Sequence, residues 1–132
     1  KYSVEFIKDV ISLYKSSPAL YELDENPDGF EWINNISAEE NIISYLRKSS
    51  SGETLLIVCN FADYAYEKYR IGGPFAGKYK EILNSDSEKY GGTGFTNKRV
   101  KNSREITCDF RDNSISINVA PLSVSIFNCI SG

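Results

Sequence analysis

The feature that most constrains the fold is an ordered stretch from Leu55 to Asn97. It opens with five consecutive apolar residues, Leu55 to Cys59, and such an unbroken run is typical of a strand that is covered on both faces. An Asn-Phe pair, a Tyr-Arg-Ile-Gly-Gly-Pro turn, a second strand and a glycine-rich loop follow in fixed succession. We therefore expect a central strand, with a second strand returning from the turn.

The remainder of the chain after Pro18 also has the pattern of strands, because segments rich in β-branched and aromatic residues alternate with clusters of Asn, Asp, Gly and Ser. Polar and apolar residues alternate along Ser114 to Val119, which predicts one buried and one solvated face. Asp112-Asn113 is the predicted hairpin turn before it. The pattern indicates an all-β fold, an antiparallel two-sheet β-sandwich. The predicted strands are Phe30–Asn34, Ile42–Arg47, Thr54–Asn60, Glu67–Ile71, Lys78–Asn84, Glu105–Phe110, Ser114–Val119 and Leu122–Ile130.

An amphipathic helix precedes the sandwich. Tyr2 to Lys15 places apolar residues at helical spacing, and Ser16-Ser17-Pro18 ends the helix because proline disfavours the α conformation before it. An all-β sandwich has no intrinsic need of such a helix. Its apolar stripe must therefore pack on the sandwich or be exposed, and an exposed stripe is more typical of an interface than of a free surface.

Length and charge narrow the class of protein. The chain has 132 residues, enough for one core, and its 15 basic and 18 acidic residues give a net charge of −3 without a basic run. We expect no nucleic-acid partner. No apolar stretch of roughly 18 residues is present to span a membrane, and Lys8 and Asp9 interrupt the N-terminal apolar positions, which argues against a signal peptide. A cytoplasmic protein without membrane contact is expected.

Reactive residue types are scarce. Cys59, Cys108 and Cys129 are widely spaced, odd in number and outside any CxxC pair, so we expect buried thiols. Histidine is absent, which removes the commonest zinc ligand and the usual base of a nucleophilic triad. We expect no metal, no cofactor and no catalytic residue in this chain. Methionine is absent too, and a piece of a longer protein is the simpler account of a chain that opens with Lys1.

Several motifs, each weak alone, follow one another along most of the chain. They are Ser17-Pro18-Ala19-Leu20-Tyr21-Glu22-Leu23, Asp28-Gly29-Phe30-Glu31-Trp32-Ile33, Val58-Cys59-Asn60-Phe61, Tyr69-Arg70-Ile71-Gly72, Leu83-Asn84-Ser85-Asp86, Tyr90-Gly91-Gly92-Thr93-Gly94 and Ala120-Pro121-Leu122. As a set, in this order, they resemble the C-terminal domain of bacterial 1,4-alpha-glucan (glycogen) branching enzymes, which belong to the alpha-amylase superfamily. Asp63 to Glu67 and Lys98 to Arg104 depart from that pattern.

The resemblance implies a division at residue 22. Residues 1–22 would be the terminal helix and connector of a (β/α)8 barrel, and residues 23–132 the C-terminal β-sandwich. The parent enzyme would cleave an α-1,4-glucan with an aspartate nucleophile and a glutamate acid/base on barrel loops, and transfer the piece to a 6-hydroxyl. This chain would be a non-catalytic accessory domain whose partners are the barrel and, at candidate sites, α-glucan. The alternative is a free-standing carbohydrate-binding module, which predicts glucan affinity without a barrel and no uncovered helix stripe.

Three aromatic residues are the candidates for carbohydrate contact, because sugar rings stack on exposed aromatic faces. They are Trp32, Tyr79 and Tyr90. The competing use for each is the sandwich core, where Tyr and Trp also pack with their polar end reaching a partner.

Other polar residues have structural interpretations. The clusters Asp24-Glu25-Asp28 and Asp86-Glu88 lie among loop formers and are predicted to be solvated turn residues rather than a hydrolase pair. Gly91 to Gly94 is predicted to need positive φ angles rather than to hold a phosphate. Arg70 is predicted to pair with a carboxylate such as Asp86.

Overall fold

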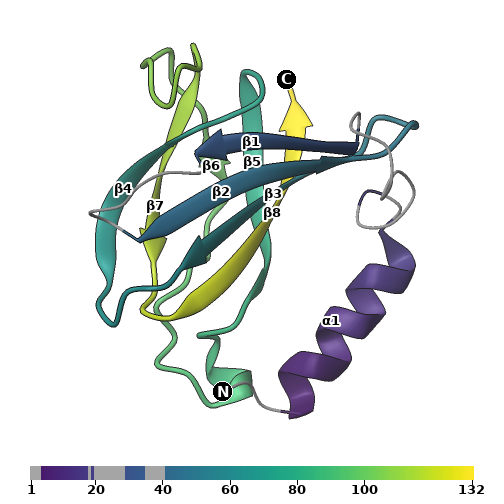
Figure 1. Ribbon diagram of the computed structural model, residues 1–132, viewed down its shortest axis with the longest axis vertical. Coiled ribbons are helices and arrows are strands. Elements are labelled where there is room, and N and C mark those ends of the chain that lie inside the picture. The colour runs from purple at the N-terminus through teal and green to yellow at the C-terminus, as the bar shows by residue number, and fades with distance from the viewer. Residues whose placement is uncertain (1–3, 18, 20–28, 35–40) are drawn as a thin grey trace.

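The structure is a computed structural model that describes residues 4–17, 19, 29–34 and 41–132. A six-stranded sheet has the order β1-β2-β3-β8-β5-β6, and a two-stranded sheet pairs β4 with β7 (Figure 1). Every pairing is antiparallel, which confirms the predicted two-sheet sandwich. The elements are α1 Val4–Ser16, β1 Phe30–Asn34, β2 Ile42–Lys48, β3 Thr54–Asn60, β4 Tyr66–Gly72, β5 Gly77–Asn84, the 3-10 turn η3 Glu88–Tyr90, β6 Lys101–Asn102, β7 Ser114–Val119 and β8 Ser123–Ser131.

Strand β3 lies at the centre of the large sheet, as its apolar run predicts. It pairs without interruption with β2 on one side and β8 on the other. Leu56 and Val58 point into the core between the two sheets, whereas Leu55 and Ile57 point to the opposite face, where α1 packs (Figure 1). Both faces of β3 are therefore covered, one by a sheet and one by the helix.

Helix α1 buries only part of its apolar surface. Phe6 is buried, and Val10 and Leu13 pack beside it against the outer face of the large sheet. Ile7 and Ile11 are 48% and 51% exposed, although they belong to the same predicted stripe. The helix thus covers the sheet with one side and presents a second apolar side to the surroundings.

The predicted strand from Glu105 to Phe110 is wrong. The chain forms a tight turn there, in which Cys108 and Arg111 exchange two backbone hydrogen bonds of 3.0 and 2.9 Å. Asp109 and Phe110 at its centre have φ angles of 55° and 63°, the pattern of a type I′ hairpin turn. The hairpin turn is therefore not at Asp112-Asn113, and a non-glycine pair holds the left-handed conformation.

Smaller corrections concern strand ends and thiols. Leu122 has a φ angle of 46°, which departs from extended backbone, and it precedes β8 rather than opening it. Cys129 is buried as predicted, but Cys59 and Cys108 are only partly buried. The Cys108 thiol lies 3.4 Å from the carbonyl oxygen of Arg70, to which it donates.

Tyr79 is the largest side chain in the core between the sheets. It is fully buried, and its hydroxyl donates to the carbonyl oxygen of Phe75 and accepts from the Phe75 N–H at 3.4 Å. Burial raises the pKa of this phenol to about 12, so it is neutral throughout the physiological range. Its ring presents no face to a sugar, so the structure gives this candidate a core role.

We predict that Tyr79→Phe lowers the free energy of unfolding by about 1–2 kcal/mol, because the Phe75 carbonyl loses its donor in a buried position. Urea denaturation with matched m-values is the measurement. Tyr64→Phe is the control, since the Tyr64 hydroxyl is exposed and its removal should change stability by less than about 0.5 kcal/mol. Equal effects of the two variants would contradict the buried role of the Tyr79 hydroxyl.

Candidate functional site

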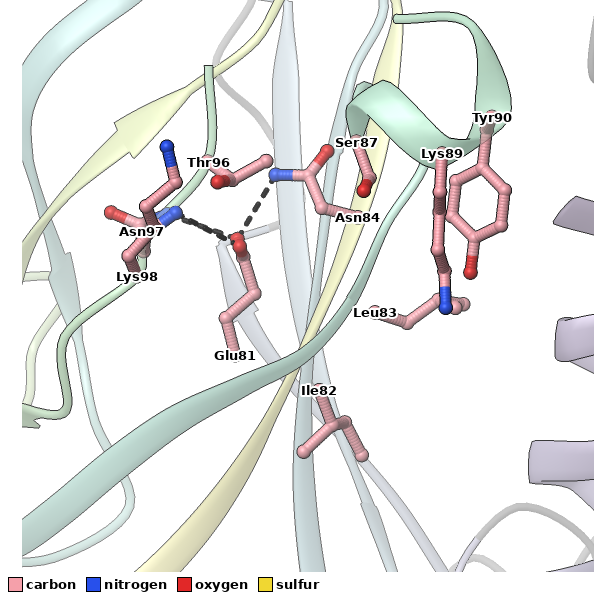
Figure 2. Close-up of a pocket in the computed structure, with 10 residues that line it drawn as sticks. All are labelled: Glu81, Ile82, Leu83, Asn84, Ser87, Lys89, Tyr90, Thr96, Asn97 and Lys98. Carbon is pink, nitrogen blue, oxygen red and sulfur yellow. Dashed lines mark hydrogen bonds between the residues drawn. The ribbon is translucent and has the colours of Figure 1, made fainter. Parts of the chain in front are cut away.

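A cavity of about 360 Å³ lies beside the C-terminal half of β5. Figure 2 shows β5 on one side and η3 with the following loop on the other, with polar side chains directed between them. The wall consists of Glu81, Ile82, Leu83, Asn84, Ser87, Lys89, Tyr90, Thr96, Asn97 and Lys98. Several polar side chains converge on this cavity, which makes it the candidate site.

A β-bulge in β5 shapes this wall. Glu81 pairs with Phe127 and Leu83 with Ile126, so Ile82 is an extra residue without a partner on β8. Strict alternation would place Leu83 on the same face as Glu81. Instead Leu83 packs in the cluster beneath α1, because the bulge shifts the phase of the strand. Ile82 is consequently directed outward and is 37% exposed.

The carboxylate of Glu81 is the centre of a hydrogen-bond network. Oε1 accepts from the backbone N–H of Asn97 at 2.9 Å, and Oε2 accepts from Asn97 Nδ2 at 2.9 Å and Asn84 Nδ2 at 3.0 Å (Figure 2). Burial raises the pKa of the Glu81 carboxyl, and these donors offset that effect only in part. Glu81 therefore holds the loop that contains Asn97 against β5, although burying its carboxylate costs solvation energy.

Asn97 extends the network to the second sheet. Its Nδ2 donates to the carbonyl oxygen of Asn118 at 2.9 Å, and its Oδ1 accepts from the Asn118 N–H at 2.8 Å. Asn118 belongs to β7 in the small sheet, whereas Glu81 belongs to β5 in the large one. A buried loop asparagine thus links the two sheets at this edge through satisfied polar contacts.

The glycine-rich loop is held by Asp86. The Asp86 carboxylate accepts from Thr93 Oγ1 at 2.5 Å and from the backbone N–H of Phe95 at 3.0 Å. Gly91 and Gly94 have φ angles of 87° and 85°, which confirms the predicted need for glycine. Asp86 is therefore a loop-forming residue, in line with its predicted structural use.

Arg70 does not pair with Asp86. Its Nη1 donates instead to Ser114 Oγ at 2.9 Å, across the β4–β7 pair. The predicted partner is wrong because Asp86 is occupied by its own loop, and the register of the small sheet brings Ser116 and Ser114 next to Arg70. A strand pairing this specific could not be read from composition.

Tyr90 connects the loop to helix α1. Its hydroxyl donates to Asp9 Oδ2 at 2.6 Å, and its ring meets Phe6 edge-on with centroids 5.0 Å apart. Lys89 Nζ lies 3.0 Å from the same Asp9 oxygen. The hydrogen bond from Tyr90, and then that from Lys89, lowers the pKa of the Asp9 carboxyl. A second cavity, of about 260 Å³, lies between α1 and β5 beside this contact.

Trp32 lies at the other edge of the large sheet, on β1. Its ring is 45% exposed and is held edge-on by Phe30 and Tyr45, with centroids 5.0 and 5.8 Å away. Beside it, Glu31 pairs with Lys48 at 2.5 Å and with the Arg111 guanidinium. The ring is therefore rigidly supported from within the protein while part of its surface is exposed.

The three predicted carbohydrate candidates do not form one site. Tyr79 is in the core, Trp32 lies on β1, and Tyr90 lies beside the cavity of Figure 2. The cluster Asp24-Glu25-Asp28 lies outside the described residues. Sequence reasoning missed Glu81, Asn84 and Asn97, because the bulge and the return of the loop bring them together.

Within the described residues, no helix is long and apolar enough to cross a membrane.

A family model and curated relatives of known sequence point to the same kind of domain. A family model described as "Alpha amylase, C-terminal all-beta domain" matches residues 32–130. The "1,4-alpha-glucan branching enzyme GlgB" of Bacillus cereus strain Q1 is 39% identical over 127 residues, and that of Synechococcus elongatus is 40% identical over 129 residues. The alignments cover 96% and 97% of this chain. The chain spans 20% and 17% of the length of these curated relatives.

We predict that Glu81→Gln lowers the free energy of unfolding at pH 7 by roughly 1–3 kcal/mol, because it places an amide N–H₂ against the Asn84 and Asn97 donors. The exposed control Glu105→Gln should leave stability nearly unchanged. Urea denaturation of each variant and the wild type is the measurement.

The difference between wild type and Glu81→Gln should also depend on pH. Since burial raises the pKa of Glu81, the folded state binds a proton at higher pH than the unfolded state. The contribution of Glu81 to stability therefore increases as pH falls through its folded pKa, and levels off below its unfolded pKa. The gap between the two proteins should widen from pH 7 toward pH 4. A gap that narrows would show that the network lowers this pKa instead.

Proposed function

This chain belongs to the family of alpha-amylase C-terminal all-beta domains, and we propose from that membership that it works as the accessory domain of a 1,4-alpha-glucan branching enzyme. The parent would transfer α-1,4-glucan segments to 6-hydroxyls with two carboxylates on its barrel loops. We assign no step of that transfer to the residues of this chain. Its role is to stabilise the barrel and to bind glucan at a site distant from the catalytic residues. We expect the enzyme to work in a bacterial cytoplasm.

The observation that supports this role best is the uncovered apolar side of α1. Ile7 and Ile11 are about half exposed, one turn apart, on a helix whose other side is already buried. Neighbouring apolar side chains exposed on a helix mark an interface more often than a free surface. The alternative, a free-standing carbohydrate-binding module, predicts that this side is covered. The exposed pair therefore favours docking to the catalytic barrel of the same enzyme.

The glucan contact that we propose for this domain is Trp32. Its indole ring is supported by Phe30 and Tyr45 and exposed on its outer side, as a sugar-stacking platform requires. Charged groups adjoin this residue, since Arg111 pairs with Glu31 and its Nη2 donates to the Trp32 carbonyl oxygen at 3.2 Å. An uncharged polyhydroxyl chain could use both kinds of contact.

We predict that the double variant Ile7→Asp/Ile11→Asp loses association with a branching-enzyme barrel by at least tenfold, because two charges would have to be buried against it. The measurement is a pull-down with the separately expressed catalytic segment of the Bacillus cereus relative. The matched control is Val100→Asp/Ile106→Asp, two exposed aliphatic residues away from the helix. Equal capture of both double variants would contradict helix-mediated docking.

We further predict that Trp32→Ala migrates faster than wild type in a native gel that contains glycogen, because the stacking surface is removed. Tyr64→Ala, which removes an exposed aromatic ring elsewhere, should be retarded like the wild type. The same gel without glycogen corrects for changes in shape. Equal retardation of wild type and Trp32→Ala would rule out Trp32 as the glucan contact.

A further inference from the structure

The two cavities beside β5 share a wall, and we refer to the pair as the groove. Both are lined by Ile82, Leu83, Lys89 and Tyr90. From this shared wall, the larger cavity extends toward Asn97 on the loop, and the smaller one extends along α1 to Ser12 and Ser16. The larger cavity, of about 360 Å³, falls within the usual size range of ligand sites.

The groove carries balanced charges. Glu81 and Asp9 contribute one negative charge each, and Lys89 and Lys98 one positive charge each. Asp9 and Lys89 also bind each other at 3.0 Å. Because these charges sum to zero, the groove has no net charge that would favour an anion or a cation. Its lining therefore suits an uncharged polar ligand.

Hydrogen-bonding capacity is left over along the groove. Asn84 Nδ2 carries two N–H groups and donates one of them to Glu81, and a carboxylate has about four acceptor positions, of which three are used here. The hydroxyls of Ser87 and Thr96 line the same wall. The lining therefore offers both donors and acceptors, which sugar hydroxyls can use.

Apolar side chains are present in the wall that the two cavities share. Ile82, directed outward by the bulge, and Tyr90 line both cavities, although Figure 2 shows them at separate places along the wall. Bulges frequently re-aim side chains next to functional sites. An aliphatic side chain and an aromatic ring in the same lining offer apolar surface to the C–H faces of a sugar chain.

We propose that this groove binds a short linear segment of uncharged α-linked glucan, as a site separate from Trp32. The identity of the sugar rests on the proposed function. Asp9 lies in the groove and Ile11 on the exposed apolar side of α1, and two residues rotate by roughly 200° along an α-helix. Docking through the apolar side would therefore leave the groove open to glucan.

The test is a titration of the ¹⁵N-labelled chain with maltoheptaose, followed by amide chemical shifts. We expect shifts at Ser87, Thr96 and Asn97, and at least tenfold weaker groove binding for Ile82→Glu. Ile130→Glu is the matched control, because Ile130 is also exposed on the large sheet but lies outside both cavities, and it should bind like the wild type. Ser12→Arg, on the helix side of the groove, is a second blocking variant should Ile82→Glu fail to fold.

The other outcomes separate the two proposals. Unchanged groove shifts in both blocking variants would overturn the groove site, and equal binding of cellohexaose would overturn its preference for α-linkages. Shifts confined to the surroundings of Trp32 would also overturn the groove site while leaving the accessory-domain function in place. No shift with any glucan would overturn both sugar contacts, and the barrel pull-down would still decide the docking role.

Discussion

Coverage of β3 on both faces is the constraint on which the rest of the structure depends. Leu56 and Val58 require a second sheet, and Leu55 and Ile57 require a further layer on the outer face. Burial of an aliphatic side chain contributes about 1.5–3 kcal/mol, so leaving the outer pair in water would cost a large share of a domain's stability. Helix α1 contributes to that further layer through Phe6, which packs in the same cluster.

The second constraint is the gap between the two sheets where β5 of the large sheet faces β7 of the small one. The bulge at Ile82 moves Leu83 beneath the helix while Glu81 still faces β7. Asn97 then fills the gap with hydrogen bonds to Glu81 and to the backbone of Asn118. One irregularity in β5 thus serves both layers at once, and β5 and the loop together line the larger cavity.

The sequence predicted the features that arise from local periodicity. Alternation defined β7, the continuous apolar run placed β3 at the centre, and helical spacing located α1. It did not predict the Asp109-Phe110 turn, because two non-glycine residues with positive φ have no local preference for that conformation. The aromatic candidates were ambiguous for a related reason, since a tyrosine such as Tyr79 can serve a core or a surface, and only strand pairing decides.

Helix α1 also explains how docking and sugar contact could coexist in one small domain. Its buried side, with Phe6, completes the core, and the side with Asp9 borders the groove through Tyr90. Ile7 and Ile11 occupy a third side that makes neither contact. Because the Asp9–Tyr90 hydrogen bond ties the helix to the loop, a barrel bound at the third side would restrain the wall of the groove without entering it. If both proposals hold, glucan in the groove would extend the surface of the barrel, rather than bind to an independent module.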